Sequence, residues 1–245
     1  MDKIEEFRRE CKNRVKSYGS DKALKMASKV FIDESTRTKY SYNFSWMGRP
    51  IIQYPQDILA MQEIIWNVRP DLIIETGIAH GGSLIFYASM LELLGEGGKV
   101  LGIDIDIREH NRCEIEKHPM FKRIIMIEGS SIEKSVIEKV RKYAQGKKRV
   151  LVCLDSLHTQ NHVLQELEVY SPLVTKGSYC VVFDTIVEDL PYEYSADRPW
   201  GKGNNPKTAV WEFLKKNDRF VIDKKIENKL LITAAPDGYL NCVKD

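Results

Sequence analysis

The stretch DLIIETGIAHGGSLIFYASMLELLGEGGKVLGIDID (Asp71–Asp106) decides the fold. It reads as a short apolar strand, a glycine-rich turn, an apolar helix that stops at glycines, and a second apolar strand. Neither strand alternates apolar with polar residues, which is typical of strands that are buried on both faces of a parallel sheet. The stretch therefore predicts a strand–helix–strand unit whose two strands lie in one sheet.

The same alternation of strand and helix continues toward the C-terminus, which favours an α/β fold with a parallel sheet. Three further parallel strands are expected at RIIMIEG (123–129), RVLVCLD (149–155) and SYCVVFD (178–184). Two last strands are expected at RFVIDKK (219–225) and KLLITAAP (229–236). The link IEN between them permits a hairpin and is too short for a parallel crossover. We predict a doubly wound, Rossmann-like, seven-stranded sheet, mostly parallel with a C-terminal antiparallel hairpin.

The chain has 245 residues, of which 43% are hydrophobic, and this is enough for one large domain with an appendage. Residues 1–60 read as helices and loops. We predict a helical extension there that contacts the substrate or a second copy of the chain, and a catalytic domain at 61–245. The segment FSWMGRPIIQYPQD (44–57), rich in aromatic residues, glycine and proline, is the expected wall of the site.

Charge and cysteine content exclude several classes of partner. The 37 basic and 35 acidic residues nearly cancel, so nothing indicates a nucleic-acid partner. No apolar run is long enough for a membrane span, and the N-terminal stretch lacks the apolar core of a signal peptide. The five cysteines are scattered, without a C-x-x-C pair, which favours a reducing compartment. We therefore expect a cytoplasmic protein.

Ligands of open α/β sheets bind at the carboxyl ends of the strands, so the residues that follow each strand are the candidates for a site. Glycines and carboxylic acids dominate these positions. In chain order the candidates are Glu75, Gly77, Gly81, Ser83, Asp104, Ser130, Asp155, His158 and Asp184.

The first turn has the pattern E-x-G-x-x-x-G-G and lacks the G-x-G-x-x-G fingerprint of dinucleotide sites. Its glycines let the backbone approach a ligand closely. Glu75 is a poor neighbour for a diphosphate and a good one for a cation. Asp104 ends the second strand, where an acid can bind both ribose hydroxyls or simply cap the strand. Together with Ser130, these residues indicate a positively charged nucleoside without phosphates, which is the form of S-adenosylmethionine.

The chain from about residue 46 onward resembles the family named for cephalosporin hydroxylase and grouped with rhamnosyl O-methyltransferases. The resemblance implies a class I methyltransferase that depends on S-adenosylmethionine. It does not extend to hydroxylation, because the sequence shows no two-histidine, one-carboxylate pattern for non-haem iron. The motifs that carry the resemblance are RPDLIIETGIAHGGSL, GIDIDIR, EGSS, LDSLHT, GSYCVVFDT and RPWGKGNNPKTAV.

The resemblance also implies a metal site and a base. In related metal-dependent O-methyltransferases the acid that ends the fourth strand binds Mg²⁺, and a base stands three residues later, a spacing that Asp155 and His158 match. An acidic pair ends the fifth strand in those enzymes. This chain has Phe183 and Asp184 there, so only Asp184 offers a carboxylate, and Thr185 offers at best a hydroxyl. Mg²⁺ accepts two carboxylates when water and substrate oxygens complete its octahedron.

Two further features complete the expected site. A neutral imidazole near its ordinary pKa can accept a proton at cell pH, so His158 is the candidate general base, although a helix cap or a solvent-facing ring would use the same residue type. The loop YEYSADRPWGKGNNPKT (192–208) follows the fifth strand and reads as a lid or as a connector. Trp200, Lys202 and Asn204 are its candidate contacts to a polar acceptor.

We predict an O-methyltransferase that uses S-adenosylmethionine, with Mg²⁺ assistance, on a hydroxyl of a small polar acceptor. A sugar or a precursor of a glycan or natural product is the first expectation, by analogy. Two alternatives stay open at this point. One is an NAD-dependent oxidoreductase on a related sheet, and the other is a non-catalytic scaffold that binds the cofactor, which the departure at Phe183 keeps in view.

Overall fold

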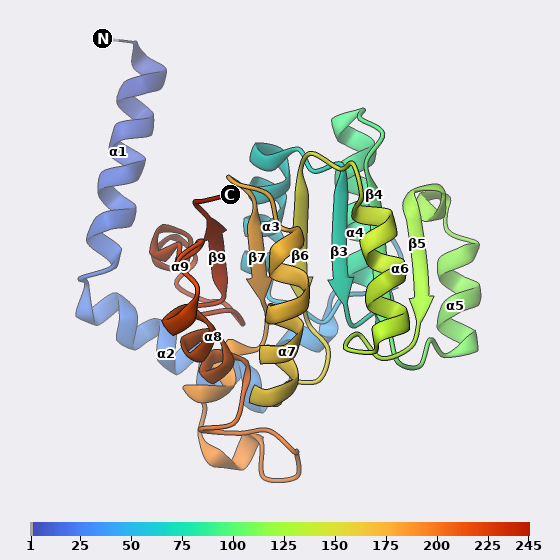
Figure 1. Cartoon of the computed structure of the whole chain (residues 1–245). Coiled ribbons are helices and arrows are strands. Elements are labelled where there is room, and N and C mark those ends of the chain that lie inside the picture. The colour runs from blue at the N-terminus through green and yellow to red at the C-terminus, as the bar shows by residue number, and fades with distance from the viewer. Residues whose placement is uncertain (1) are drawn as a thin grey trace.

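The computed structural model describes residues 2–245 and places the predicted sheet at the centre of the molecule (Figure 1). Seven strands form it, in the spatial order β5-β4-β3-β6-β7-β9-β8. The strands are β3 (Leu72–Thr76), β4 (Lys99–Asp104), β5 (Ile124–Glu128), β6 (Val150–Leu154), β7 (Tyr179–Val182), β8 (Phe220–Ile222) and β9 (Tyr239–Cys242).

The sheet is parallel from β5 to β7, and β9 alone runs against its two neighbours β7 and β8. In Figure 1 the arrows of the parallel strands point down, so their carboxyl ends share the lower edge of the sheet. The order of strands reverses between β3 and β6, which are neighbours although β4 and β5 separate them in the sequence. This reversal is the switch point at which a doubly wound sheet binds its ligand.

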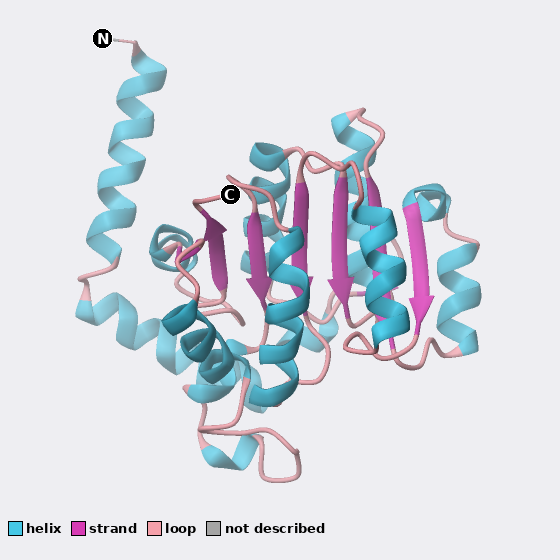
Figure 2. Cartoon of the chain, viewed as in Figure 1, coloured by secondary structure: helices cyan, strands magenta, loops and turns pink. Residues whose placement is uncertain are grey.

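Helices cover both faces of the sheet (Figure 2). Two apolar layers result, one around α3, α4 and α5 and the other around α6, α7 and α8. No helix within residues 2–245 is long and apolar enough to cross a membrane. The helices are α1 (Lys3–Tyr18), α2 (Lys22–Arg37), α3 (Pro55–Val68), α4 (Gly82–Leu94), α5 (Glu109–Glu116), α6 (Lys134–Ala144), α7 (Gln160–Tyr170), α8 (Pro206–Lys216) and α9 (Lys224–Leu230).

The last two strands differ from the sequence prediction in their position and in their link. The segment 226–228, expected as a hairpin turn, lies inside α9, whose first turn is capped by the side chain of Asp223. Residues 229–236 form no strand in the described structure, because Leu231 has a positive φ and Thr233 and Ala234 donate hydrogen bonds to Asp57. β9 supplies the antiparallel strand instead, so the sheet topology is as predicted while the tight hairpin is wrong.

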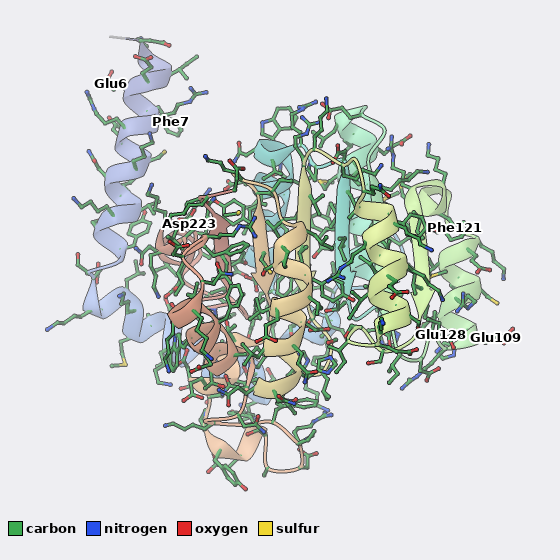
Figure 3. All side chains as sticks on the ribbon, in the orientation of Figure 1. Glu6, Phe7, Glu109, Phe121, Glu128 and Asp223 are labelled. Carbon is green, nitrogen blue, oxygen red and sulfur yellow. The ribbon has the colours of Figure 1, made fainter. Side chains whose placement is uncertain are left out.

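The N-terminal helices lie at the side of the domain. None of the sixteen described residues of α1 is buried, and Figure 3 shows Glu6 and Phe7 on the part of α1 that stands clear of the rest. The junction of α1 and α2 rests on α9, where a β-carbon at Gly19 would meet the Asn228 side chain. Contact of this segment with a second copy of the chain stays a prediction.

The segment that follows α2 returns to the body of the molecule. It contains a 3₁₀ turn, η1 (Tyr40–Asn43), and a two-stranded ladder, β1 (Ser45–Trp46) and β2 (Arg49–Pro50). Trp46 fixes the ladder to α4 by donating its indole N–H to Ser89 Oγ at 3.1 Å. The expected boundary after residue 60 falls within α3, whose buried side chains belong to the core of the main domain.

Candidate functional site

The glycine turn after β3 forms the first part of the site at the carboxyl edge. Gly77 has φ +90°, and a β-carbon there would lie 2.0 Å from the backbone carbonyl oxygen of Asp155. Gly81 has φ +80° and caps α4, with the Ile115 side chain where its β-carbon would be. Only glycine fits both positions without strain, and the turn therefore packs directly on the loop that carries Asp155.

Glu75 and Ser83 meet beneath this turn. Glu75 is fully buried, and its Oε2 accepts a hydrogen bond from Ser83 Oγ at 2.8 Å. Its Oε1 is buried and has no hydrogen-bond partner among residues 2–245. Burial raises the pKa of Glu75 to about 8, against the opposing effect of the Ser83 hydrogen bond. The two residues that the sequence proposed for one ligand thus contact each other, and one oxygen is left without a donor.

Asp104 ends β4 and binds the glycine turn. Its Oδ2 accepts hydrogen bonds from the backbone N–H groups of Ile78 at 2.8 Å and Ala79 at 3.2 Å. Its Oδ1 accepts from the N–H of Asp106. The capping role that the sequence left open is therefore present. Ser130 lies at the neighbouring tip, after β5, and is half-buried.

The N-terminal ladder clamps the same turn from outside. The Arg49 guanidinium donates to the His80 carbonyl through Nε at 2.9 Å and through Nη2 at 2.6 Å. The same group donates to Asn111 Oδ1, and the Asn111 amide donates to the Ala79 carbonyl. Neither residue was predicted from the sequence, because neither follows a strand, although the segment containing Arg49 was expected to form a wall of the site.

Asp155, His158 and Asp184 form the polar centre of the site. One ligand atom from each lies within 4.8 Å of those of the other two. His158 Nε2 is 3.2 Å from Asp184 Oδ2, and the imidazole side chain is only 14% exposed. The structure thus brings together the three residues that the sequence placed on two different strand tips.

Electrostatics at this centre favour a cation. Burial, followed by the charges of Asp184 and Glu75, raises the pKa of Asp155 well above its ordinary value. Two carboxylates and an imidazole at this spacing are a donor set that fits a divalent cation. A bound cation would offset the mutual repulsion of these acids.

The residues on either side of Asp184 do not add a ligand. Phe183 is buried at 2% exposure within the core, and its ring has no donor atom. Thr185 is fully buried and donates its hydroxyl to the Pro236 carbonyl at 2.6 Å. The Thr185 hydroxyl is thus buried against the Pro236 carbonyl, and the carboxylates that could hold a metal are those of Asp155 and Asp184, with His158 beside them.

A further buried acid, Asp57 on α3, lies near this centre. It accepts hydrogen bonds from Ala234 N–H at 2.8 Å and from Tyr239 Oη–H at 2.7 Å, and a third comes from the Thr233 hydroxyl. Burial nevertheless raises the pKa of Asp57 to about 6, and the nearby charge of Asp184 adds to the shift. Asp57 was not predicted from the sequence. A carboxylic acid in the first turn of an otherwise apolar helix was the available signal.

The loop after β7 reaches the centre through Trp200. Its ring meets the His158 ring edge-to-face at a centroid distance of 5.0 Å. Asn204 fastens the loop, since Oδ1 accepts from Gln160 N–H at 3.0 Å and Nδ2 donates to the Pro199 carbonyl. Lys202 is exposed beside it. In Figure 1 this orange loop extends below the carboxyl ends of the strands, where an acceptor would approach.

Replacing Glu75 with glutamine is expected to stabilise the ligand-free protein at high pH. The folded pKa near 8 lies above the ordinary value of 4.5, so the folded state holds a proton that the unfolded state releases. Stability from this group therefore falls as pH rises from about 4.5 through 8. Urea unfolding should show a variant more stable by a few kcal/mol at pH 9 and nearly unchanged at pH 4. A constant difference across this range would contradict the buried acid.

Comparison with known proteins gives a family. The model of the rhamnosyl O-methyltransferase/CmcI family matches residues 38–243, which is most of the chain. The chain belongs to this family. Membership confirms the resemblance drawn from the sequence, and with it the class of S-adenosylmethionine-dependent O-methyltransferases.

Individual relatives agree with this assignment. The rhamnosyl O-methyltransferase of Mycobacterium tuberculosis (strain ATCC 25618 / H37Rv) is 29% identical over 200 residues, which cover 80% of this chain and 77% of the relative. The Mycobacterium leprae (strain TN) enzyme of the same name is 30% identical over 148 residues, covering 60% of this chain and 62% of the relative.

Solved structures of methyltransferases have the same fold. The apo structure of CmcI superposes with a TM-score of 0.63 at 20% identity, over 83% of this chain and 78% of CmcI. The Mg–SAM structure of CmcI gives 0.60 at 18% identity, with the same coverage. The O-methyltransferase from Bacillus cereus, in complex with SAH, gives 0.52 at 14% identity over 80% of this chain and 81% of that one. The predicted class I methyltransferase fold is thus confirmed.

Proposed function

We propose that this chain moves the methyl group of S-adenosylmethionine to a hydroxyl oxygen of a sugar, with a rhamnosyl group as the first acceptor to test. The observation that carries the proposal is the cluster of Asp155, His158 and Asp184 beside the glycine turn. A base and two acids at the edge where a class I sheet binds its cofactor are what deprotonation of a hydroxyl requires. The relatives named rhamnosyl O-methyltransferase suggest the acceptor class.

The cofactor site in this proposal is the glycine turn with the neighbouring tips. Gly77 and Gly81 let the backbone of the turn approach the ligand closely. Asp104 and Ser130 lie at the ends of β4 and β5, where the adenosine would bind. Glu75, held by Ser83, supplies a carboxyl oxygen for the cationic end of the molecule, whose charge would favour the deprotonated form of this buried acid. The acids on this edge attract the positively charged substrate over its neutral product.

His158 takes the proton of the acceptor hydroxyl. Asp184 Oδ2, 3.2 Å from Nε2, favours the tautomer with hydrogen on Nε2, which leaves the lone pair of Nδ1 to accept the proton. The same carboxylate stabilises the imidazolium that forms. The hydroxyl oxygen then attacks the methyl carbon in line with the departing sulfur, and most of the rate comes from holding these atoms in position.

Asp155 and Asp184, with the imidazole of His158 beside them, are the residues that would hold a divalent cation. When bound, such a cation lowers the pKa of a coordinated hydroxyl and orients its oxygen. Phe183 leaves this chain with two carboxylates at the centre, which Mg²⁺ accepts when waters complete the shell.

Replacing Trp200 with alanine is expected to lower kcat by about tenfold, because the edge-to-face contact that limits rotation of the His158 ring is lost. Binding of S-adenosylhomocysteine should change less than twofold, since the ring lies on the acceptor side. Steady-state kinetics and calorimetry of the same preparation give both values. Replacement of Trp211, an exposed tryptophan on α8, is the matched control and should leave kcat unchanged.

Methyl transfer itself is tested with S-adenosylmethionine that carries a deuterated methyl group. The purified chain is incubated with rhamnosides and with matched glucosides, and mass spectrometry follows the labelled methyl group. Labelled methyl ether on the rhamnoside alone supports the full proposal. Labelled product on other sugars only would overturn the acceptor class. Cofactor binding without transfer to any acceptor would favour the scaffold alternative.

A further inference from the structure

Gln53 is a buried amide without a partner. It lies in the loop between β2 and α3 and is only 4% exposed. Neither its Nε2 nor its Oε1 has a hydrogen-bond partner within the described part of the chain, residues 2–245. A buried polar group left unpaired costs about 1–3 kcal/mol, so an amide with both ends unpaired is expensive. Such a side chain is retained at this cost when a ligand satisfies it.

The path of the loop places Gln53 above the switch point of the sheet. Upstream, the Pro50 carbonyl and Ile51 Cα pack on Gly82, the first residue of α4, where a β-carbon would lie 2.1 Å from the Pro50 oxygen. Downstream, Asp57 binds Ala234, whose carbonyl accepts from Ile186 N–H beyond β7. The loop therefore crosses the carboxyl edge from the tip of β3 to the tip of β7.

Gln53 lies about midway along this crossing. β6 lies between β3 and β7, and neighbouring strands are about 4.8 Å apart, so the crossing spans roughly 10 Å. Its midpoint falls over the end of β6, where the chain continues into Asp155 beside the glycine turn. This path brings residue 53 to the carboxyl edge, on the side of the sheet that α3 and α4 cover.

A second unpaired atom lies at the start of the same crossing. Glu75 Oε1 is buried and unpaired among the described residues, with the equally unpaired Tyr87 hydroxyl near the same carboxyl group, while Ser83, adjacent to Gly82, occupies the other oxygen. Together, the site offers an amide donor, an amide acceptor and the carboxyl group of Glu75, which a bound cation would hold in its charged, accepting form. A group with an ammonium and a carboxylate on one carbon complements all three, because the ammonium donates to the two acceptors and the carboxylate accepts from the amide.

We infer that Gln53 binds the α-amino-acid end of the cofactor, with its amide N–H on the carboxylate and its carbonyl beside the ammonium shared with Glu75. The inference rests on the proposed function, because it assumes a sulfonium nucleoside in the site. It adds a binding residue from the N-terminal segment, outside the methyltransferase sheet. It also gives that segment a reason to pack on the glycine turn: it completes the pocket that the turn begins.

The test compares two ligands that differ only at this end. Calorimetry measures S-adenosylhomocysteine, which carries the amino acid, and 5′-methylthioadenosine, which lacks it, on the wild type and on Gln53→Leu. We expect the variant to bind S-adenosylhomocysteine about 10- to 100-fold more weakly, as for a lost hydrogen bond to a charged group, and 5′-methylthioadenosine within about twofold of wild type. Gln145→Leu, an exposed glutamine at the end of α6, is the matched control and should change neither.

Thermal unfolding of the free proteins gives an independent readout. Leucine removes a buried unpaired amide, so the melting temperature of Gln53→Leu should rise by about 2–6 °C although the cofactor analogue binds more weakly. Gln53→Met repeats both measurements with an unbranched apolar side chain if leucine fails to fold. A higher melting temperature together with a lower affinity for S-adenosylhomocysteine would support a contact between Gln53 and the ligand.

Three outcomes overturn the inference. Equal weakening of both ligands would indicate general damage to the pocket, and no weakening of either would show that the amide does not contact the cofactor. A lower melting temperature with unchanged ligand selectivity would assign Gln53 a structural role. Failure of the wild type to bind either nucleoside would instead refute the proposed function, and the two failures are thereby distinguished.

Discussion

Replacing Asp155 with asparagine is expected to lower kcat/KM for methyl transfer by about 10³-fold or more, equivalent to roughly 4 kcal/mol of transition-state stabilisation. Asp155 is one of two carboxylates in the candidate metal set, and its backbone contacts the glycine turn. The asparagine keeps the shape and removes the charge. Because burial and neighbouring acids already disfavour that charge, the melting temperature of the free variant should rise.

The control for this variant is Asp218→Asn. That carboxylate is 83% exposed, precedes β8 and pairs with Lys244, away from the carboxyl edge. Its removal should leave kcat/KM within about twofold, as for most exposed ion pairs. Kinetics with saturating S-adenosylmethionine and differential scanning calorimetry are measured on both variants. A loss of activity below tenfold would show that Asp155 is not a metal ligand. A lower melting temperature would show that its charge is not disfavoured by burial and the neighbouring acids.

His158→Ala is expected to lower kcat by about 10²- to 10⁴-fold, the usual contribution of a general base, while binding of S-adenosylhomocysteine stays within a few-fold. The imidazole is held between Asp184 and the Trp200 ring, and this fixes its orientation. Steady-state kinetics and calorimetry of both proteins measure these two quantities.

Added imidazole provides a second readout, because a small base in the vacated space should restore part of the activity of the alanine variant. His110→Ala, an exposed histidine of α5, is the matched control and should behave as wild type. A His158 variant with full activity would remove the base from the mechanism. A variant that loses activity together with S-adenosylhomocysteine binding would assign the histidine to the cofactor pocket.

The parallel part of the fold could be predicted from sequence because buried strands carry continuous apolar runs that no helix period explains. The C-terminal part could not. The run at 229–236 is apolar enough for a strand, but the positive φ of Leu231 turns its backbone. Asp57 on α3, distant in sequence, then accepts the hydrogen bond of the Ala234 N–H. Contacts of this kind, 177 residues apart in sequence, override local propensity.

The site divides in the same way. Asp155, His158 and Asp184 were predictable because strand ends of a parallel sheet converge at one edge. Asp57 lies on α3 and Gln53 in the loop before it, so neither follows a strand of the main sheet, and only the tertiary path of this segment brings it to the carboxyl edge. Two contacts could not be predicted from the sequence, because they depend on side-chain direction: the hydrogen bond of Ser83 to Glu75, and those of the turn amides to Asp104.

The central claim is that the carboxyl edge binds a sulfonium nucleoside, and calorimetric titration tests it most directly. S-adenosylmethionine and NAD are each titrated into the chain, in Mg²⁺ and again in EDTA. The structure predicts saturable binding of S-adenosylmethionine and no heat from NAD, because Glu75 and the E-x-G-x-x-x-G-G turn offer no site for a diphosphate. Saturable binding of NAD without binding of S-adenosylmethionine would contradict the account.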